Sequence, residues 1–235
     1  MPQPFRFKQF SVHDDCCGQK VGTDSILLGS WAFANRVTNV LDIGTGCGLL
    51  TLMLAQRFSN ASITAIEIDQ SAYQQVRQNF FTSPWAHRLT AIHADARKFT
   101  PATSFDLIVC NPPYFESSLK PADDCRATAR HNQQLTFQEL SEISAALLNQ
   151  QGRFCVVLPF DRAAEFTDIA KHFDLYLIRR CDVRPIPAAK FKRSLLEFGR
   201  QIPTSVEVDE LVLEESRHQY SDGYIALAKD FLLKM

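Results

Sequence analysis

The sequence predicts an α/β fold in which helices cover both faces of a mostly parallel sheet. Short apolar, β-branched runs alternate with longer segments of helical periodicity, which is typical of repeated strand–helix–strand units. A glycine-rich turn follows the first clear strand directly and precedes a helical segment. With 235 residues, of which 46% are hydrophobic, the chain is long enough and apolar enough to bury a sizeable core.

The elements follow in order along the chain. Strands are predicted over residues 40–43, 63–68, 89–93, 105–110 and 154–158, and helices over 49–58, 70–81, 137–148 and 163–172. Thr136 and Glu139 have the spacing of a capping box at the start of the third helix, and we expect Gly152 to end that segment. Two or more strands are expected within residues 173–199, followed by a less regular tail.

Composition limits the organisation and the partners. No Gly- or Ser-rich linker interrupts the chain, so we expect one domain over 1–235, with an extension at 1–30, a core at 31–200 and a tail at 201–235 that completes it. The formal charge of −1 excludes a polybasic protein. Apolar windows are too short for a membrane span, and the seven cysteines lack metal-ligand spacing. We therefore expect a reduced, cytoplasmic, monomeric protein without membrane or metal partners.

The first candidate site is the glycine-rich turn. Gly44, Gly46 and Gly48 allow a tight turn and a close backbone approach to a ligand. A dinucleotide-binding fingerprint would need its third glycine at Leu49, and the carboxylate of Asp42 would lie unfavourably beside a pyrophosphate. The same carboxylate suits a cationic amine or sulfonium, so electrostatics favours S-adenosylmethionine. A tight turn that binds nothing is the alternative.

Two further carboxylates follow the next strands. Glu67 ends the second predicted strand, where it could accept hydrogen bonds from ribose hydroxyls. Asp95 follows the third, where it could meet an adenine ring. Because the carboxyl ends of parallel strands share one edge, these groups and the glycine turn should lie close together.

The candidate reaction site follows the fourth strand. Asn111 and Pro112 offer a side-chain and a backbone carbonyl oxygen, and two acceptors suit a planar NH2 group. Pro112 and Pro113 fix the backbone, and Tyr114 could stack on the ring that carries the amine. Orientation and electrostatic complementarity would then drive methyl transfer without a general base. A Pro-Pro turn that only ends the strand is the alternative.

At these motifs the chain resembles class I S-adenosylmethionine-dependent methyltransferases with an Asn-Pro-Pro-Tyr motif. Residues 20–29, 111–115 and 130–131, together with the ending at 224–231, are similar to the bacterial tRNA1(Val) (adenine(37)-N6)-methyltransferase family. The resemblance implies a Rossmann-like, mostly parallel seven-stranded sheet, with S-adenosylmethionine as cofactor and tRNA as substrate.

The resemblance also implies residue roles. It places Asp42, Gly44 and Gly46 around the methionine part of the cofactor, Glu67 on the ribose and Asp95 on adenine, with Thr45 and Gly48 also at the cofactor. It places Asn111, Pro112, Pro113 and Tyr114 on the target base, and Lys20 and Thr23 over the cofactor or target. The tetrapeptide alone does not choose between adenine in tRNA, a base in ribosomal RNA and a protein glutamine. A glutamine methyltransferase usually carries an N-terminal helical domain, for which the 38 residues before Asn39 are too few. An RNA-binding assembly factor that retains the fold is the alternative from another class.

A basic segment near the predicted reaction site suggests an RNA surface. Residues 179–200 contain seven basic and two acidic side chains, whereas residues 205–222 are mainly acidic. Such a strip would hold phosphates and make binding salt-dependent. A solvated hairpin with alternating charges is the alternative. The candidate RNA-binding residues are Arg179, Arg180, Lys190, Lys192 and Arg193.

Overall fold

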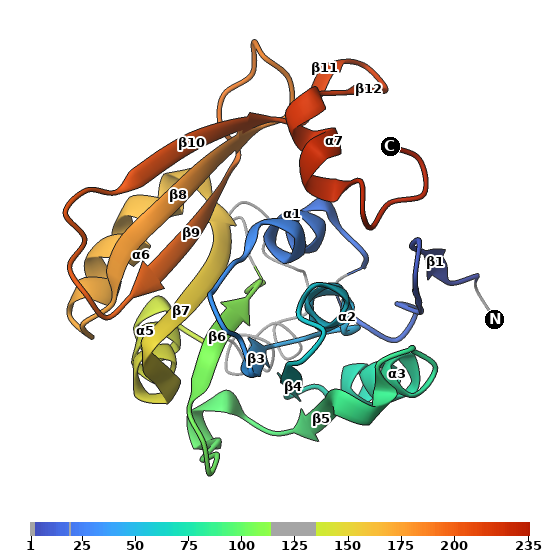
Figure 1. Ribbon diagram of the computed structural model, residues 1–235, viewed down its shortest axis with the longest axis vertical. Helices are drawn as coiled ribbons and strands as arrows, with labels where there is room; N and C mark the ends of the chain where they lie inside the picture. The colour runs from blue at the N-terminus through green and yellow to red at the C-terminus, as the bar shows by residue number, and fades with distance from the viewer. Residues whose placement is uncertain (1–2, 19, 114–134) are drawn as a thin grey trace, which may run out of the picture.

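A central sheet of eight strands organises the molecule (Figure 1). The computed structural model describes residues 3–18, 20–113 and 135–235. Within these residues the strand order is β10-β8-β9-β7-β6-β3-β4-β5. The strands are β3 (Asn39–Ile43), β4 (Ser62–Glu67), β5 (Leu89–His93), β6 (Phe105–Cys110), β7 (Leu148–Pro159), β8 (Tyr176–Arg184), β9 (Arg193–Gly199) and β10 (Glu207–Val212).

The sheet is mostly parallel, as predicted. Every neighbouring pair is parallel except the two that involve β9, which is antiparallel to β7 and to β8. The expected count of seven strands is wrong, because β10 pairs in parallel with β8 and adds an eighth. This strand comes from the segment predicted to be a less regular tail.

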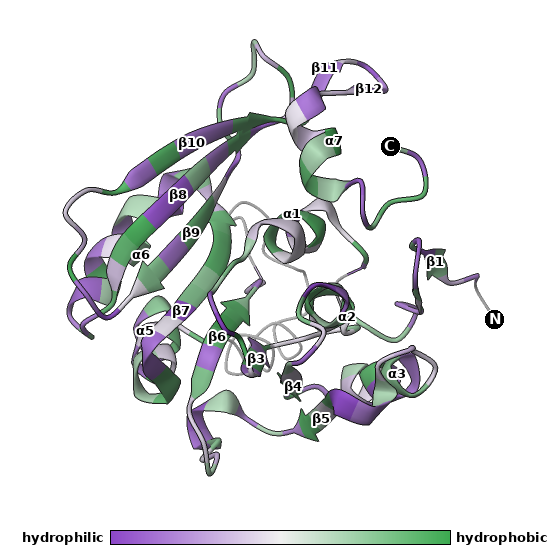
Figure 2. Ribbon diagram, in the orientation of Figure 1, coloured by the Kyte–Doolittle hydropathy of each residue, from purple (hydrophilic) through white to green (hydrophobic). Residues whose placement is uncertain are grey.

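Helices cover both faces of the sheet, and each face has its own apolar core. One face carries α1 (Thr23–Trp31), α2 (Leu49–Arg57), α3 (Gln70–Phe81) and α7 (Asp222–Ala228), and the other carries α5 (Phe137–Leu147) and α6 (Ala163–Lys171). Side chains alternate along β6, so that Leu107 and Val109 join the first core while Ile108 and Cys110 join the second. Burial on both faces explains why β6 and the second half of β7 are mainly hydrophobic in Figure 2.

Local sequence signals set most element boundaries. Thr136 caps α5, and its hydroxyl accepts from the backbone N–H of Glu139 at 3.1 Å while the Glu139 carboxylate accepts from the Thr136 N–H at 2.8 Å. The predicted capping box is therefore confirmed. The role expected of Gly152 is wrong, because β7 begins at Leu148 and runs through this glycine. A Cβ at residue 152 would lie 2.9 Å from the backbone oxygen of Phe105, so close strand packing requires glycine here.

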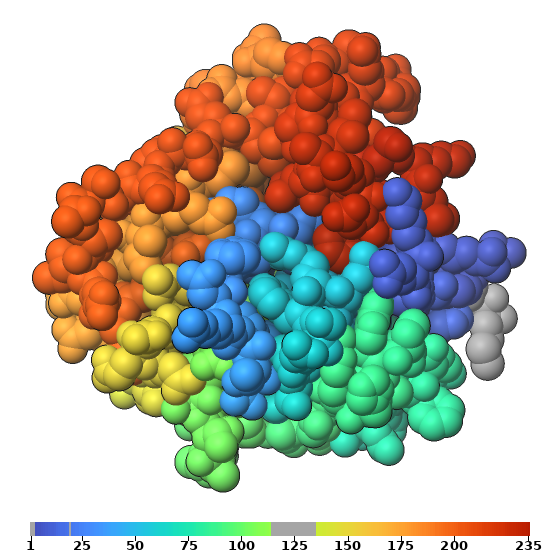
Figure 3. Space-filling model, viewed as in Figure 1, coloured from blue at the N-terminus to red at the C-terminus, as the bar shows by residue number. Residues whose placement is uncertain are grey.

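The two ends of the chain lie side by side on the surface (Figure 3). The N-terminal hairpin pairs β1 (Phe5–Arg6) with β2 (Ser11–Val12), and β11 (Glu214–Ser216) pairs with β12 (Gln219–Tyr220) just before α7. The backbone N–H of Lys8 donates to the carbonyl of Phe231 at 2.8 Å. Within the part of the chain that the structure describes, no helix is both long and apolar enough to cross a membrane.

Candidate active site

The glycine turn follows β3 at the carboxyl edge of the sheet and is hydrogen-bonded to the end of β4. The backbone N–H groups of Gly44 and Thr45 donate to the carbonyl of Ile66 at 2.9 and 3.1 Å. Gly44 and Gly46 have φ values of +70° and +58°, a left-handed backbone that side chains with a Cβ adopt rarely. A Cβ at either residue would meet no atom within 4 Å, so the space above the turn is open to a ligand.

Gly48 has a different role. It caps α2 with φ +85°, and a Cβ here would lie 2.6 Å from a methyl of Val76 and 2.7 Å from the ring of Phe80. This glycine therefore allows the start of α2 to pack against α3. It does not line the cavity beside the turn.

Asp42 is a buried carboxylate beneath the turn, with 1% of its surface exposed. Its Oδ2 accepts from the hydroxyls of Thr45 at 2.6 Å and Thr51 at 2.7 Å. Burial raises its pKa to about 6, although the two hydroxyl hydrogen bonds act in the opposite direction. A cation in the adjacent cavity would favour the ionised form.

Glu67 holds the turn from the end of β4. Its Oε2 accepts from the Gly46 N–H at 2.8 Å, and its Oε1 accepts from the Asp69 N–H at 2.9 Å. Each carboxylate oxygen has a second lone pair, so the side chain can still accept from hydroxyls of a ligand. Glu67 thus fixes the turn from outside the cavity lining, and a ribose contact from this carboxylate remains a prediction.

Asp95 follows β5 but lies outside the cavity wall. It caps a short 3-10 helix, accepting from the Arg97 N–H at 3.0 Å, and forms an ion pair with the Arg97 guanidinium at 2.9 Å. These contacts with Arg97 hold the pKa of Asp95 below its ordinary value. An adenine contact from Asp95 remains a prediction.

Asn111, the first residue of the predicted reaction motif, lines the same cavity as the turn. Asn111 follows β6, whose last pairs align Ile43 with Cys110, so the motif begins beside the glycine turn. Its Nδ2 donates to Oγ of Ser25 in α1 at 2.9 Å. The cavity is lined by Lys20, Ser25, Asp42, Gly44, Thr45, Gly46, Cys47, Leu49, Leu50 and Asn111.

Several predicted positions are not part of this geometry. Tyr114 and the 130–131 pair lie outside the described residues, and Thr23 begins α1 without lining the cavity. Lys20 does line it, while its ammonium group donates to the Asp14 carbonyl at 2.6 Å. Ser25 was not predicted, and its only sequence signal is its position within the 20–29 segment.

The five predicted RNA-binding residues do not form one strip. Arg179 and Arg180 are consecutive on β8 and point to opposite faces of the sheet. The Arg179 guanidinium lies 3.8 Å from the ring centre of Trp31 and pairs with Glu197 at 2.8 Å. Arg180 pairs with Asp182 at 2.7 Å. These two arginines therefore contribute to the packing around β8.

The two lysines present their charges to solvent. Lys190 and Lys192 are exposed in the loop between β8 and β9, at the same sheet edge as the reaction motif. The loop is braced by the Lys192 N–H, which donates to the Val183 carbonyl at 2.8 Å. Arg193 differs, because its Nε donates to the Asp24 carboxylate at 2.8 Å.

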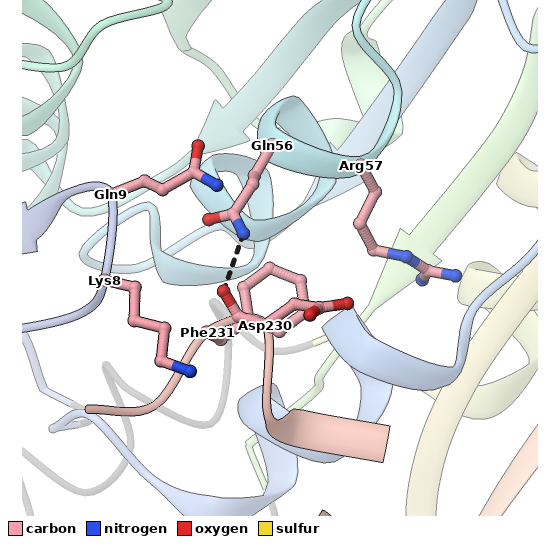
Figure 4. A pocket seen from close by; sticks show the side chains of 6 residues that line it. All are labelled: Lys8, Gln9, Gln56, Arg57, Asp230 and Phe231. Atoms are coloured by element: carbon pink, nitrogen blue, oxygen red, sulfur yellow. Dashed lines mark hydrogen bonds between the residues drawn. The ribbon is translucent and has the colours of Figure 1, made fainter. Parts of the chain in front are cut away.

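A larger hollow of 420 Å³ lies at the other end of α2 (Figure 4). α2 starts beside the glycine turn, and its nine residues span roughly 14 Å, which separates the hollow from the reaction motif. Gln56 donates to the Asp230 carbonyl at 2.9 Å, and the Arg57 guanidinium donates to the Gly29 carbonyl at 2.9 Å. These contacts join α1, α2 and the C-terminal segment. Among the described residues, no group of three or more His, Cys, Asp or Glu could hold a metal ion.

Comparisons with known proteins agree with this fold. The family model "Methyltransferase small domain" matches residues 17–176. A solved structure of a predicted O-methyltransferase from Agrobacterium tumefaciens superposes with a TM-score of 0.68 at 18% identity, over 88% of this chain and 96% of that one. A glycopeptide N-methyltransferase superposes with a TM-score of 0.58 at 14% identity, over 80% of this chain and 97% of that one. The protein is a Rossmann-like methyltransferase.

Closer relatives define the family. A protein from Flavobacterium johnsoniae is 46% identical over 98% of this chain and 100% of its own length. One from Phocaeicola vulgatus is 45% identical over 100% of both chains. Both are named tRNA1(Val) (adenine(37)-N6)-methyltransferase. The chain belongs to this family, as the sequence motifs predicted.

Proposed function

We propose that this protein transfers a methyl group from S-adenosyl-L-methionine to N6 of adenosine 37 in the anticodon loop of tRNA1(Val). The observation that carries the proposal is full-length identity of 45–46% to relatives named for that reaction. The position of Asn111 supports it, because Asn111, which would bind the substrate amine, lines one cavity with the glycine turn, which would bind the cofactor. We further propose that the chain acts as a cytoplasmic, monomeric, single-domain enzyme.

The residues at the turn fit the cofactor. Open space above Gly44 and Gly46 admits a ligand against the backbone, and buried Asp42 offers negative charge to the cationic methionine end. Glu67 would accept from the ribose hydroxyls. When bound, S-adenosylmethionine supplies an electrophilic methyl group on a sulfonium. Asp95 is proposed to meet the adenine ring.

The reaction motif would hold the acceptor amine. The side-chain oxygen of Asn111 and the backbone carbonyl of Pro112 accept the two N6 hydrogens, which turns the nitrogen lone pair toward the methyl group. Pro113 keeps the backbone rigid, and Tyr114 is proposed to stack on the base. The new N–C bond forms as the C–S bond breaks, the electron pair goes to sulfur, and the nitrogen then loses a proton to water.

An anticodon-loop adenine suits this site physically. Its base is unpaired, so moving it out of the stack costs less than extracting one from a duplex. Lys190 and Lys192 would contact phosphates beside the target, because they are exposed at the edge that carries the reaction motif. Arg179, Arg180 and Arg193 would support the site indirectly, because each forms an ion pair with an acidic side chain. Arg179 and Arg180 would stabilise β8, and Arg193 would stabilise the start of α1.

The test is methyl transfer to separated RNA classes. Purified protein is incubated with labelled S-adenosylmethionine and tRNA, ribosomal RNA or protein from a strain that lacks this gene. We expect label in tRNA alone, released as N6-methyladenosine. Label in ribosomal RNA or in protein glutamine would overturn the substrate, and binding of cofactor without transfer would favour an RNA-binding assembly factor.

A further inference from the structure

One hydrogen bond joins the reaction motif to a distant helix. Nδ2 of Asn111 donates to Oγ of Ser25 at 2.9 Å, across 86 positions of the chain. Ser25 lies in the first turn of α1, and both residues line the cavity beside the glycine turn. No other part of the proposed reaction requires this serine.

The bond matters because an asparagine amide has two unlike ends. The side-chain carbonyl oxygen accepts hydrogen bonds, whereas the NH2 group only donates. Rotation about the terminal torsion is broad and roughly two-fold, so an unrestrained amide can exchange the positions of the two ends. Only the orientation with the oxygen toward the acceptor amine supports methyl transfer. Anchoring Nδ2 fixes the amide plane and thereby the direction of Oδ1.

The start of α1 is itself held in place. Asp24, the neighbour of Ser25, pairs with Arg193 at the start of β9 at 2.8 Å. Leu27 and Leu28 follow in the helix and are buried in the core, with 1% and 0% exposure. The serine hydroxyl is therefore presented from a rigid element, which is the requirement for a group that orients another side chain.

We infer that Ser25 is a positioning residue that orients the Asn111 amide for amine methylation. The inference rests on the proposed function, because it assumes that Asn111 binds the acceptor amine. In this role Ser25 acts through another side chain. Ser25 sets the orientation of the Asn111 amide, and Asn111 makes the contact with the substrate.

Ser25→Ala tests this role, with Ser30→Ala as a matched control. Ser30 lies in the same helix, and its buried hydroxyl has no hydrogen-bond partner among the described residues. We expect Ser25→Ala to lower kcat for tRNA about ten- to a hundred-fold, the scale of a misplaced reacting group. The cofactor Kd and the melting temperature should match those of the control. Ser25→Thr, which keeps the hydroxyl, should retain most of the rate.

A double variant separates orientation from a general effect on folding. In the Asn111→Ala background, removing the Ser25 hydroxyl should cause no further loss of kcat, because the amide that it orients is gone. Equal losses in both backgrounds would overturn the inference, as would full activity of Ser25→Ala when Asn111→Ala is inactive. The second result would leave the proposed function intact. Full activity of Asn111→Ala would overturn the assumed role of Asn111, and the inference with it.

Discussion

Replacing Asp42 with Asn should stabilise the cofactor-free protein at neutral pH. Burial raises the pKa of this carboxyl from its ordinary 3.8 to about 6. That shift of about two units corresponds to a cost of about 3 kcal/mol for holding the ionised group in the folded state. An asparagine has nearly the same shape, and its side-chain oxygen can still accept from Thr45 and Thr51 without carrying a charge.

The sign follows from linkage. The folded state favours protonated Asp42, so the contribution of this group to stability is present below about pH 4 and is lost as the pH rises through about 6. Urea unfolding of wild type and Asp42→Asn without cofactor, from about pH 4 to pH 7.5, isolates the effect because other carboxyls titrate in both proteins. The difference should be small at low pH and approach about 3 kcal/mol in favour of the variant at pH 7.

The same substitution should weaken cofactor binding. Without the carboxylate, the cationic methionine end loses its buried partner, so the Kd for S-adenosylmethionine by calorimetry should rise at least about tenfold at pH 7.5. Wild-type affinity should itself fall as the pH drops below about 6, whereas that of the variant should not follow this step. A variant that is less stable at every pH, or that binds the cofactor as tightly as wild type, would refute the reasoning.

Three other substitutions test the site. Asn111→Ala should lower kcat about 100-fold or more with little change in cofactor Kd, because the amine loses an acceptor; a large loss of cofactor affinity would mean that the reaction site is misplaced. Glu67→Gln should lower the affinity for the cofactor and destabilise the turn, because an amide accepts at only one end and the Gly46 N–H already requires an acceptor. An unchanged cofactor Kd by calorimetry would rule out a ribose contact from Glu67. Replacing both Lys190 and Lys192 with Ala should reduce the slope of log K for RNA binding against log salt concentration by about 1.4 in magnitude. An unchanged slope would mean that these lysines face solvent and do not contact phosphates.

The sequence predicted those elements whose signals are local. Burial on both faces makes residues 107–110 of β6 a continuous apolar run, and Thr136 with Glu139 signals the start of α5 directly. β10 gave no such signal, because this edge strand carries Glu207, Asp209 and Glu210 and most of its side chains are exposed. Its identity as a strand comes from pairing with β8, which no local pattern encodes.

The parts of the site that follow recognisable strands were also predictable from local sequence signals. The glycine turn and Asn111 stand at the ends of recognisable strands, so parallel topology alone brings them to one edge. Ser25 reaches Asn111 only through tertiary packing, and a single serine carries no pattern. The charge count around Arg179 predicted a strip, but strand alternation and an ion pair with Glu197 direct this side chain into the fold.

The central claim is that the protein methylates N6 of adenosine 37 in tRNA1(Val). The most direct measurement uses tRNA1(Val) transcript and a variant transcript with guanosine at position 37, each incubated with the protein and labelled S-adenosylmethionine. Nucleoside mass spectrometry and mapping of the modified position then follow. We expect N6-methyladenosine at position 37 and no label in the variant transcript. Equal label in both transcripts, or label in neither while ribosomal RNA or protein is methylated, would contradict it.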